Sequence, residues 1–283
     1  MSGGLRMTGG VAHAPTRGVR ALILGIIGLV FAIPIVAMVE FTLRKGLTGG
    51  YDFSRWLALF QSGFTGPYRP VLVALGNSVA LAIGTVAIVL LLLVPTMVLV
   101  HLRFPRLRRM LEIICILPIS IPAIVLVVGL APVYAVVARL FGSGVWTLAL
   151  AYGITVLPYA YRAIQSNLDA VDVRTMSEAG RTLGAGWGTI LLRVLLPNLR
   201  RGILAGAFIS VAVVLGEFTI ASLLNRVNLQ TALVVVSKND PYTAVILSLL
   251  ALIFAFLLLI VIGRLGARRP RTTRRRSITK GLS

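Results

Sequence analysis

Charged and redox-active side chains are scarce in this sequence of 283 residues. Only 13% of the residues are charged and 58% are hydrophobic, whereas about 25% of the residues in an ordinary soluble domain are charged. One globular core cannot bury this much apolar surface, so the composition excludes a soluble domain and indicates a membrane protein. The single cysteine, Cys115, excludes an intramolecular disulfide. With only two histidines, His13 and His101, we expect no His/Cys metal site.

A phosphate-binding loop is also missing. Each lysine (Lys45, Lys238 and Lys280) is followed by glycine or asparagine, whereas the Walker A pattern requires a following serine or threonine. The chain therefore cannot hydrolyse ATP through a P-loop. Asp169 and Asp172 lie in a polar connector with no histidine or nucleophile beside them, and we interpret them as solvated rather than catalytic. We expect a chain that is not an enzyme.

What is abundant is long apolar runs, each able to cross a bilayer, which takes roughly 20 residues. These runs are 21–39, 71–100, 113–138, 140–161, 202–225 and 241–263. They predict an all-α polytopic membrane protein with about six transmembrane helices. The first run could be a signal peptide, but it exceeds the usual apolar core of one and no small-x-small cleavage pattern precedes Glu40. We interpret it as a retained span.

The basic residues predict the orientation. Most of the 28 lysine and arginine residues lie in segments on the same side as the N-terminus, so the positive-inside rule assigns both termini to the cytoplasm. The net charge of +20 does not indicate nucleic-acid binding, because the charges form short clusters between uncharged runs. We expect a mobile tail at 1–18, a transmembrane domain at 19–267, and a basic tail at 268–283 whose nearest partner is anionic lipid rather than RNA.

Prolines and one carboxylate interrupt the predicted spans. Pro118, Pro122 and Pro132 lie in the third run, which predicts either irregular helix packing or a helix that lines a pathway. Glu217 is the only acidic residue within a predicted span. It either contacts a cation in a translocation pathway or makes structural hydrogen bonds, and we favour the structural role. Gly202-x-x-x-Gly206 predicts a close helix approach in the fifth run.

The longest inside connector, about 164–201, has its own pattern. Thr175 or Ser177 can cap a helix, which places a carboxylate in the first turn, and Gly184 can end that helix with a positive φ. A second short helix is predicted over 187–196, and Pro197 is expected to end it before the fifth span begins. These features predict a helix-turn-helix on the cytoplasmic surface.

This connector resembles the cytoplasmic loop of the binding-protein-dependent ABC importer permeases. The family pattern is Glu-Ala-Ala, three residues, Gly, nine residues, then Ile-x-Leu-Pro. Every spacing is kept here, with Gly in place of the second Ala and Val in place of Ile. The matching residues are Glu178, Ala179, Gly180, Gly184, Val194, Leu196 and Pro197. A shorter stretch at 117–122 resembles the spermidine/putrescine-type permeases, and one at 215–218 resembles a segment shared by the polyamine, sulfate/molybdate and related permeases.

The resemblance implies a role for each part of the loop. In this family the loop is a coupling helix between the fourth and fifth spans, and it docks on a cytoplasmic ATPase subunit. Glu178 would make a polar contact with the ATPase, and Ala179 and Gly180 would leave room for close approach. Gly184, Leu196 and Pro197 would fix the geometry of the loop. Glu217, Pro118 and Pro122 are candidates for the translocation pathway.

The resemblance also implies partners. They are two ATP-binding cassette subunits that hydrolyse ATP with magnesium, a second permease chain (identical or different), an extracytoplasmic solute-binding protein and membrane lipids. No cofactor is expected on this chain, and the expected location is the bacterial inner membrane. The solute is expected to be small, with a polyamine-like cation favoured. The alternatives are an ion-coupled secondary transporter and a membrane enzyme. Both are weakly supported, because no clear internal repeat and no cluster of catalytic residues is seen.

Overall fold

The computed structural model describes residues 16–45, 49–61 and 68–267, which form helices and connectors with one isolated β-bridge between Arg44 and Tyr51. Five helices within these ranges are long and apolar enough to cross a membrane. They are α1 (Arg17–Leu43), α3 (Arg69–Arg103), α5 (Ala123–Phe141), the continuous helix Trp187–Gly216, and α12 (Pro241–Ala267). The predicted all-α polytopic class is therefore confirmed.

The predicted tails are largely outside the described residues. The basic tail 268–283 and residues 1–15 of the N-terminal tail are not described. The first helix begins at Arg17. Thr16 caps this helix by accepting a hydrogen bond from the backbone N–H of Val19.

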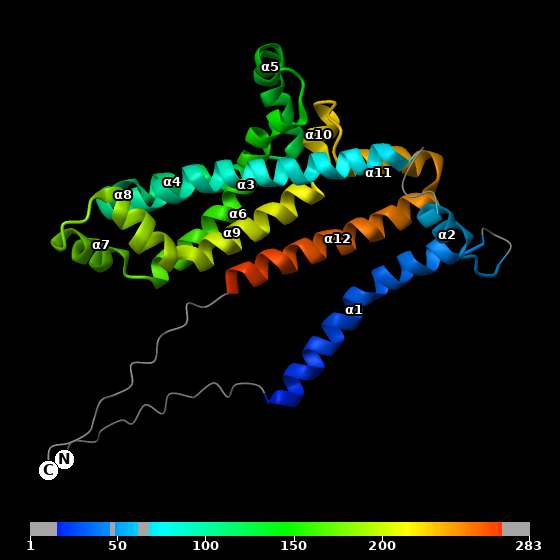
Figure 1. Ribbon diagram of the computed structural model, residues 1–283, viewed down its shortest axis with the longest axis horizontal. Helices are drawn as coiled ribbons and strands as arrows, with labels where there is room; N and C mark the ends of the chain where they lie inside the picture. Colours follow the sequence, from blue (N-terminus) through cyan, green and yellow to red (C-terminus); the bar gives the residue numbers. More distant parts are fainter. Residues whose placement is uncertain (1–15, 46–48, 62–67, 268–283) are drawn as a thin grey trace, which may run out of the picture.

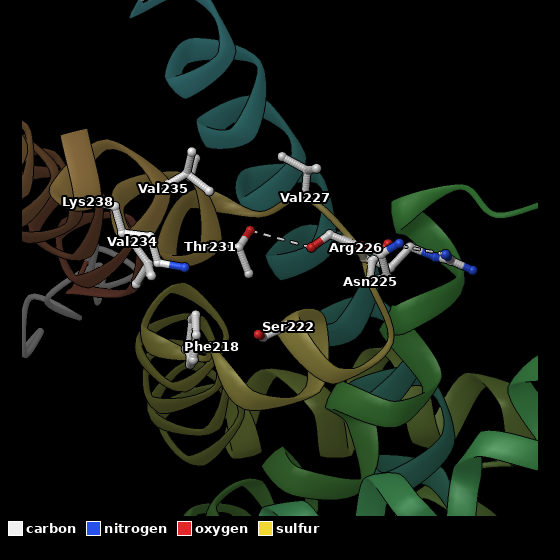
Figure 2. A pocket seen from close by; sticks show the side chains of 10 residues that line it. Phe218, Ser222, Asn225, Arg226, Val227, Thr231, Val234, Val235 and Lys238 are labelled. Carbon is white, nitrogen blue, oxygen red and sulfur yellow. Dashed lines mark hydrogen bonds between the residues drawn. The ribbon is translucent and has the colours of Figure 1, made fainter.

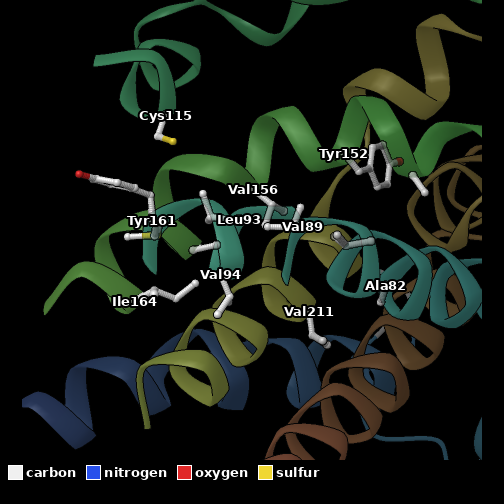
Figure 3. Packing of buried hydrophobic residues seen from close by; sticks show 14 of the residues in the cluster. Ala82, Val89, Leu93, Val94, Cys115, Tyr152, Val156, Tyr161, Ile164 and Val211 are labelled. Atoms are coloured by element: carbon white, nitrogen blue, oxygen red, sulfur yellow. The ribbon is translucent and has the colours of Figure 1, made fainter. Parts of the chain in front are cut away.

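The centre of the molecule is α6 (Ala149–Ala170), which packs between α3 and α9 (Leu196–Gly216). Figure 3 shows side chains of the three helices in one apolar cluster: Val89 and Leu93 of α3, Tyr152, Val156 and Ile164 of α6, and Val211 of α9. Because α6 takes the place of the predicted fourth span, 140–161, that prediction was shifted. Gly142, at φ +77°, ends α5 and delays the start of the next helix. The second half of α6 is polar, and α6 is not among the five apolar helices.

The predicted third span, 113–138, is wrong as a single helix. It is split into α4 (Arg108–Ile116), a 3₁₀ turn (Leu117–Ser120) and α5. Pro118 and Pro122 have no backbone N–H to donate, and each disfavours a helical conformation in the residue before it. The chain changes direction at this break, and α5 projects away from α3 (Figure 1).

The predicted fifth span, 202–225, is wrong at its C-terminal end. The helix α9 ends at Gly216, and Glu217 is extended. A short helix, α10 (Thr219–Leu223), follows, and Asn225 at φ 51° turns the chain into α11 (Leu229–Asn239). Figure 1 shows α11 at the opposite end of α3 from the helices of the long connector.

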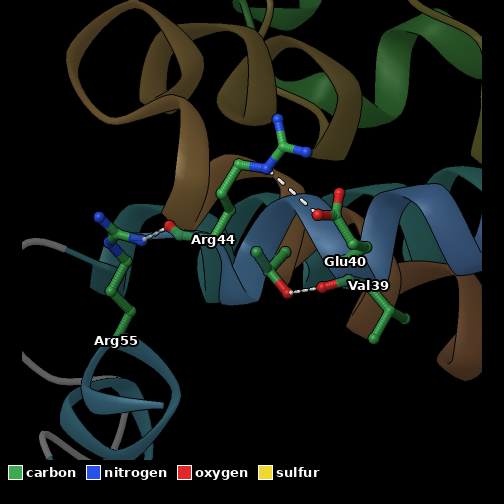
Figure 4. A network of polar contacts seen from close by, with 5 residues as sticks. Val39, Glu40, Arg44 and Arg55 are labelled. Carbon is green, nitrogen blue, oxygen red and sulfur yellow. Dashed lines mark hydrogen bonds and ion pairs between the residues drawn. The ribbon is translucent and has the colours of Figure 1, made fainter. Parts of the chain in front are cut away.

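The first helix, α1, is held mainly at its C-terminal end. Arg44 pairs with Glu40 at 3.1 Å, and Arg55 of α2 (Ser54–Gln61) donates to the Arg44 carbonyl at 3.0 Å (Figure 4). The Phe41 ring stacks on Tyr242 of α12 with centroids 4.8 Å apart. These contacts join α1, α2 and α12 at one end of the molecule.

Candidate functional site

The long connector begins with α7 (Val173–Thr182), and Asp172 is its N-cap. Its carboxylate accepts a hydrogen bond from the backbone N–H of Thr175 at 3.1 Å. Hydrogen bonds from Thr175 hold the pKa of the Asp172 carboxyl below its ordinary value. The prediction that Thr175 or Ser177 caps this helix is therefore wrong, and Glu178 lies beyond the first turn rather than within it.

The C-terminal end of α7 is closed by Gly184. This residue adopts φ +79°, as predicted. Its N–H donates to the Arg181 carbonyl at 2.9 Å, and the Ala185 N–H donates to the Gly180 carbonyl at 3.0 Å. These two bonds form a Schellman motif, which satisfies the last carbonyls of the helix. The short helix α7 is thus capped at both ends.

One face of α7 packs on the second arm of the connector, which is the helix that begins at Trp187. Val173, Ser177 and Gly180 are buried on this face. A Cβ at Gly180 would lie 3.1 Å from Cγ1 of Ile190, which is itself fully buried. Gly180 therefore faces the chain's own second arm, and the expected room for an ATPase at this residue is filled by Ile190.

The opposite face of α7 is open. Glu178 is largely exposed and pairs with Arg174 through an Nε–Oε1 distance of 3.1 Å. Ala179 is also exposed. Leu183, at the tip of the loop, is 88% exposed, and Trp187 beyond the turn is 36% exposed. Leu183 was not among the residues predicted to contact an ATPase, although a leucine directly before a helix-ending glycine is visible in the sequence.

The second arm does not end at Pro197, contrary to the prediction. The helix is continuous from α8 (Trp187–Thr189) through a π-helical turn (Ile190–Leu195) into α9. Pro197 cannot donate to the carbonyl of Arg193, and its ring crowds that carbonyl. The wider π-helical turn directly before the proline accommodates both effects. Val194 and Leu196 pack against the central apolar cluster, whereas Pro197 is exposed.

The two arms of the loop lead into a tight crossing of α6 and α9. A Cβ at Gly202 would lie 2.5 Å from Cβ of Asn167, and one at Gly206 would lie 3.6 Å from Cα of Ala160. The Asn167 carboxamide also accepts from the Gly202 N–H at 3.3 Å. The close helix approach predicted for Gly202-x-x-x-Gly206 is confirmed. The connector therefore continues into two packed helices rather than into a free segment.

An ion pair fastens α4 to the same end of α6. Arg108 Nη2 lies 2.7 Å from Asp169 Oδ1, and Gln165 donates to the same oxygen at 2.9 Å. Both charged side chains are about half exposed. Asp169 therefore has a structural partner. Among the described residues, no group of three or more His, Cys, Asp or Glu side chains is placed to hold a metal ion.

Glu217 lies at the other end of α9, in the break before α10. Its two carboxylate oxygens accept from the Ile220 N–H at 3.0 and 3.2 Å. Its carbonyl accepts from the Asn228 carboxamide at 2.7 Å. These bonds support the structural role favoured from the sequence. Pro118 and Pro122 lie at the α4–α5 break. The place of these prolines and of Glu217 in a pathway stays a prediction.

Asn228 is a structural residue that sequence reasoning missed. It is 1% exposed and donates to the Tyr152 hydroxyl at 3.1 Å as well as to Glu217. With Thr231 it forms a capping box at the start of α11. Next to it, the Leu229 N–H donates to Ser78 of α3 at 2.9 Å. This network joins α3, α6, α9 and α11. Its only visible signal was the capping pair Asn228 and Thr231.

A cavity of about 280 Å³ lies between α10 and α11. Figure 2 shows Lys238 reaching from α11 toward Phe218 and Thr231, while the Arg226 guanidinium turns away along the connector. Thr231 bonds the Arg226 carbonyl at 3.4 Å. No carboxylate is among the described residues that line this cavity. Its one inward cation, Lys238, suits a small anion better than a cation.

The sequence matches the family described as binding-protein-dependent transport system inner membrane component over residues 97–269. Because this match covers more than half of the chain, the protein belongs to that family. It is thus a membrane permease component, not a catalytic subunit, and a multi-pass inner-membrane protein. The match includes α7 and the π-helical turn. It does not support the ion-coupled secondary transporter that the sequence had left as an alternative.

Individual relatives differ in name and coverage. The chain is 34% identical over 107 residues to the spermidine/putrescine transport system permease protein PotC of Haemophilus influenzae, covering 38% of this chain and 40% of that protein. It is 32% identical over 196 residues to the probable ABC transporter permease protein y4fN of Sinorhizobium fredii, covering 66% of this chain but only 33% of the relative. It is 31% identical over 277 residues to the molybdenum transport system permease protein ModB of Mycobacterium tuberculosis, covering 91% and 97%.

Proposed function

We propose that this chain is the membrane-spanning permease subunit of an ATP-driven, binding-protein-dependent importer. Two ATP-binding cassette subunits would hydrolyse ATP with magnesium, a second permease chain would complete the pathway, and an extracytoplasmic binding protein would deliver the solute. Both termini and α7 would lie in the cytoplasm, as the distribution of basic residues favours. The observation that carries the proposal is α7 itself, a short helix capped at both ends and packed through Gly180 on Ile190.

The exposed tip of the connector supplies the contact surface for the ATPase. Leu183 and Trp187 offer apolar side chains that a groove on the partner would cover. Glu178 offers a carboxylate, and its exposed ion pair with Arg174 costs little to rearrange. A short exposed apolar surface flanked by charged residues suits docking, because the apolar centre gives affinity and the charges give orientation.

Movement of the docked helix would reach the membrane through packed contacts. Gly180 and Ile190 join α7 to the helix that becomes α9, and Gly202 and Asn167 join α9 to α6. Packed interfaces of this kind move as rigid bodies rather than bend. Closure of the two ATPases would therefore tilt α6 and α9 together and alternate the access to a pathway between two permease chains.

The contact is tested with a charge reversal. Glu178→Lys is expected to reduce both the amount of ATPase subunit that co-purifies with the chain and the rate of solute-stimulated ATP hydrolysis. Glu40→Lys is the matched control, because it makes the same charge change on a partly exposed, ion-paired carboxylate near the C-terminal end of α1, which lies at the opposite end of the molecule from α7 (Figure 1). Unchanged ATPase association and transport in Glu178→Lys would overturn the coupling role.

The transported solute is a second part of the proposal. One relative is named for spermidine and putrescine, which are polyamines, and another is named for molybdenum. The polyamine-like cation was expected from the resemblance to the spermidine/putrescine-type permeases, and Glu217, the one carboxylate within a predicted span, caps α10. The cavity between α10 and α11 offers Lys238 and no described carboxylate. These two observations favour a small oxyanion, such as molybdate, over a polyamine.

Uptake by the assembled importer separates the two solutes. We expect labelled molybdate to be imported and putrescine not to be, and we expect Lys238→Gln to lower molybdate uptake. Ser237→Ala, on the neighbouring exposed residue of α11, is the matched control because its hydroxyl bonds within its own helix at 2.8 Å. Import of putrescine that Lys238→Gln leaves unchanged would overturn the oxyanion assignment and leave the permease assignment intact.

A further inference from the structure

An apolar groove of about 310 Å³ lies between α3, α4 and α6, away from the coupling connector's exposed tip and from the cavity at α11. Leu92 and Thr96 of α3, Leu111 and Cys115 of α4, and Leu157 of α6 are among the side chains that line it. The Thr96 hydroxyl donates to the Leu92 carbonyl at 2.7 Å, so it is satisfied within its own helix. The lining therefore favours a hydrocarbon occupant rather than a polar solute.

Three arginines, spaced three residues apart, lie where α3 turns into α4. Arg103 is the last residue of α3, Arg106 lies in the 3₁₀ turn Pro105–Leu107, and Arg109 is in the first turn of α4. All three are exposed, and no described carboxylate forms an ion pair with any of them. Arg108 differs, because it is paired with Asp169. The one carboxylate on α4, Glu112, is exposed and likewise forms no ion pair among the described residues.

The cationic turn and the groove are adjacent. The groove is lined by Leu111, in the helical turn of α4 that follows Arg109, and by Thr96, which is about 10 Å along α3 before Arg103. The cationic turn therefore lies just beyond the end of the groove along both helices, and the salt bridge from Arg108 to Asp169 holds this end of α4 against α6. A ligand with one negative group and a hydrocarbon chain directly attached would satisfy both features together.

The surroundings of the turn match the surface of a bilayer. Phe104, Leu107 and Met110 are exposed apolar residues interleaved with the arginines. Such alternation is typical of segments that lie at the headgroup level, with apolar side chains in the acyl region and basic ones on the phosphates. The arginine guanidinium binds phosphate through two parallel hydrogen bonds, which suits it to this role.

We propose that the turn between α3 and α4 and the adjoining groove form a binding site for one anionic phospholipid. Its phosphate and headgroup lie on Arg106 and Arg109, with Arg103 beside them, and one acyl chain occupies the groove between α3, α4 and α6. This lipid covers the apolar groove beside α6, a helix that leads into the coupling connector. The site is independent of which solute the chain transports.

Cys115 provides a probe of this site, because it is the only cysteine of the chain and lines the groove. The full-length chain is purified in a non-ionic detergent, and the rate of Cys115 alkylation by N-ethylmaleimide is followed by mass spectrometry. Palmitoyl-oleoyl-phosphatidylglycerol is expected to slow the reaction at about 25-fold lower concentration than the phosphatidylcholine analogue, since Arg106 and Arg109 at the headgroup contribute roughly five-fold each. Inorganic phosphate is expected to have no effect.

The double substitution Arg106→Gln/Arg109→Gln is expected to bring phosphatidylglycerol to the level of phosphatidylcholine. Arg17→Gln/Arg139→Gln removes the same charge from exposed arginines elsewhere and should keep the preference. The proposal is overturned if the two lipids protect wild type equally, if phosphate alone protects, if a second copy of the chain protects without lipid, or if Arg106→Gln/Arg109→Gln keeps the preference. Should Cys115 not react at all, the ratio of the two lipids retained in a native mass spectrum gives the decision, and a ratio near one overturns the site.

Discussion

Gly180 of α7 lies against Ile190 of the second arm so closely that a Cβ at position 180 would be 3.1 Å from Cγ1 of the isoleucine. The family pattern has alanine at this position, and the glycine here is explained by packing inside the loop. A short helix in water is marginal by itself, so this contact and the two caps together hold α7 in one place. The rigidity of the connector depends on them.

Enlarging residue 180 should separate the two arms of the connector. Gly180→Leu is expected to destabilise the loop by about 1–3 kcal/mol, since the added side chain has no space beside Ile190. Solute-stimulated ATP hydrolysis should fall while basal membrane insertion is kept. Gly188→Leu is the control, because nothing lies within 4 Å of a Cβ at that position. If both variants behave alike, the packing of α7 on Ile190 is not what couples the loop.

The crossing of α6 and α9 should be sensitive to one methyl group. Gly202→Ala places its Cβ 2.5 Å from that of Asn167, which forces the helices apart and is expected to cost about 1–3 kcal/mol. Thermal unfolding of the purified chain measures this loss. Gly263→Ala in α12 meets nothing within 4 Å and should leave the midpoint unchanged or slightly raised. Equal midpoints for the two variants would argue against a tight crossing.

The cap at Asp172 gives the connector a defined pH response. The folded pKa of this carboxyl is depressed, so its stabilisation of α7 is present above the ordinary pKa of 3.8 and is lost as the pH falls through the lower folded value. At neutral pH, Asp172→Ala should make the connector more sensitive to limited proteolysis, and Asp172→Asn should be milder because asparagine also caps helices. Equal cleavage of wild type and Asp172→Ala would show that the cap contributes nothing.

Removing Asn228, the centre of its hydrogen-bond network, should destabilise the protein. Asn228→Ala leaves the Glu217 carbonyl and the Tyr152 hydroxyl without this donor, which is expected to cost about 1–3 kcal/mol. Tyr152→Phe removes one of the same bonds, so the double variant should lose less than the sum of the two single losses. Additive losses in thermal unfolding would mean that these residues do not form one unit.

Glu217→Gln separates a structural carboxylate from a pathway carboxylate. A glutamine oxygen can still accept from the Ile220 N–H, so the structural account predicts folding and uptake close to wild type. Glu217→Ala removes the acceptor and should lower stability. If Glu217→Gln folds normally but abolishes uptake, the carboxylate charge acts in the pathway and the structural account is contradicted.

Much of the structure of the long connector could be predicted from the sequence, because the residues that determine it are close together in the chain. The positive φ of Gly184 is required by the way α7 ends, and the spacing from Glu178 to Pro197 is visible in the chain. The choice of Asp172 over Thr175 as the cap was not visible, since adjacent residues can serve equally well by local rules. The place of Gly180 depends on Ile190, a contact between two arms that spacing alone does not reveal.

The membrane spans were predicted less well where prolines or a charged residue interrupt a long apolar run. Runs of apolar residues located α1, α3 and α12, but Pro118 and Pro122 split the third run and Glu217 ended the fifth. Pro197 was expected to break a helix and is instead accommodated by a π-helical turn. The network at Asn228 joins residues far apart in the chain, so only the folded structure brings them together.

The most direct test of the coupling role is a cross-link from the tip of α7. Leu183→Cys is introduced with Cys115→Ser, so that it is the only cysteine, and the assembled complex is treated with a short bifunctional reagent that joins this thiol to lysines within reach. Leu57→Cys, on an exposed residue of α2 at the other end of the molecule, is the control. The account predicts a product between Leu183→Cys and the ATPase subunit and none from Leu57→Cys. An ATPase product from Leu57→Cys alone, or no product from Leu183→Cys in an active complex, would contradict it.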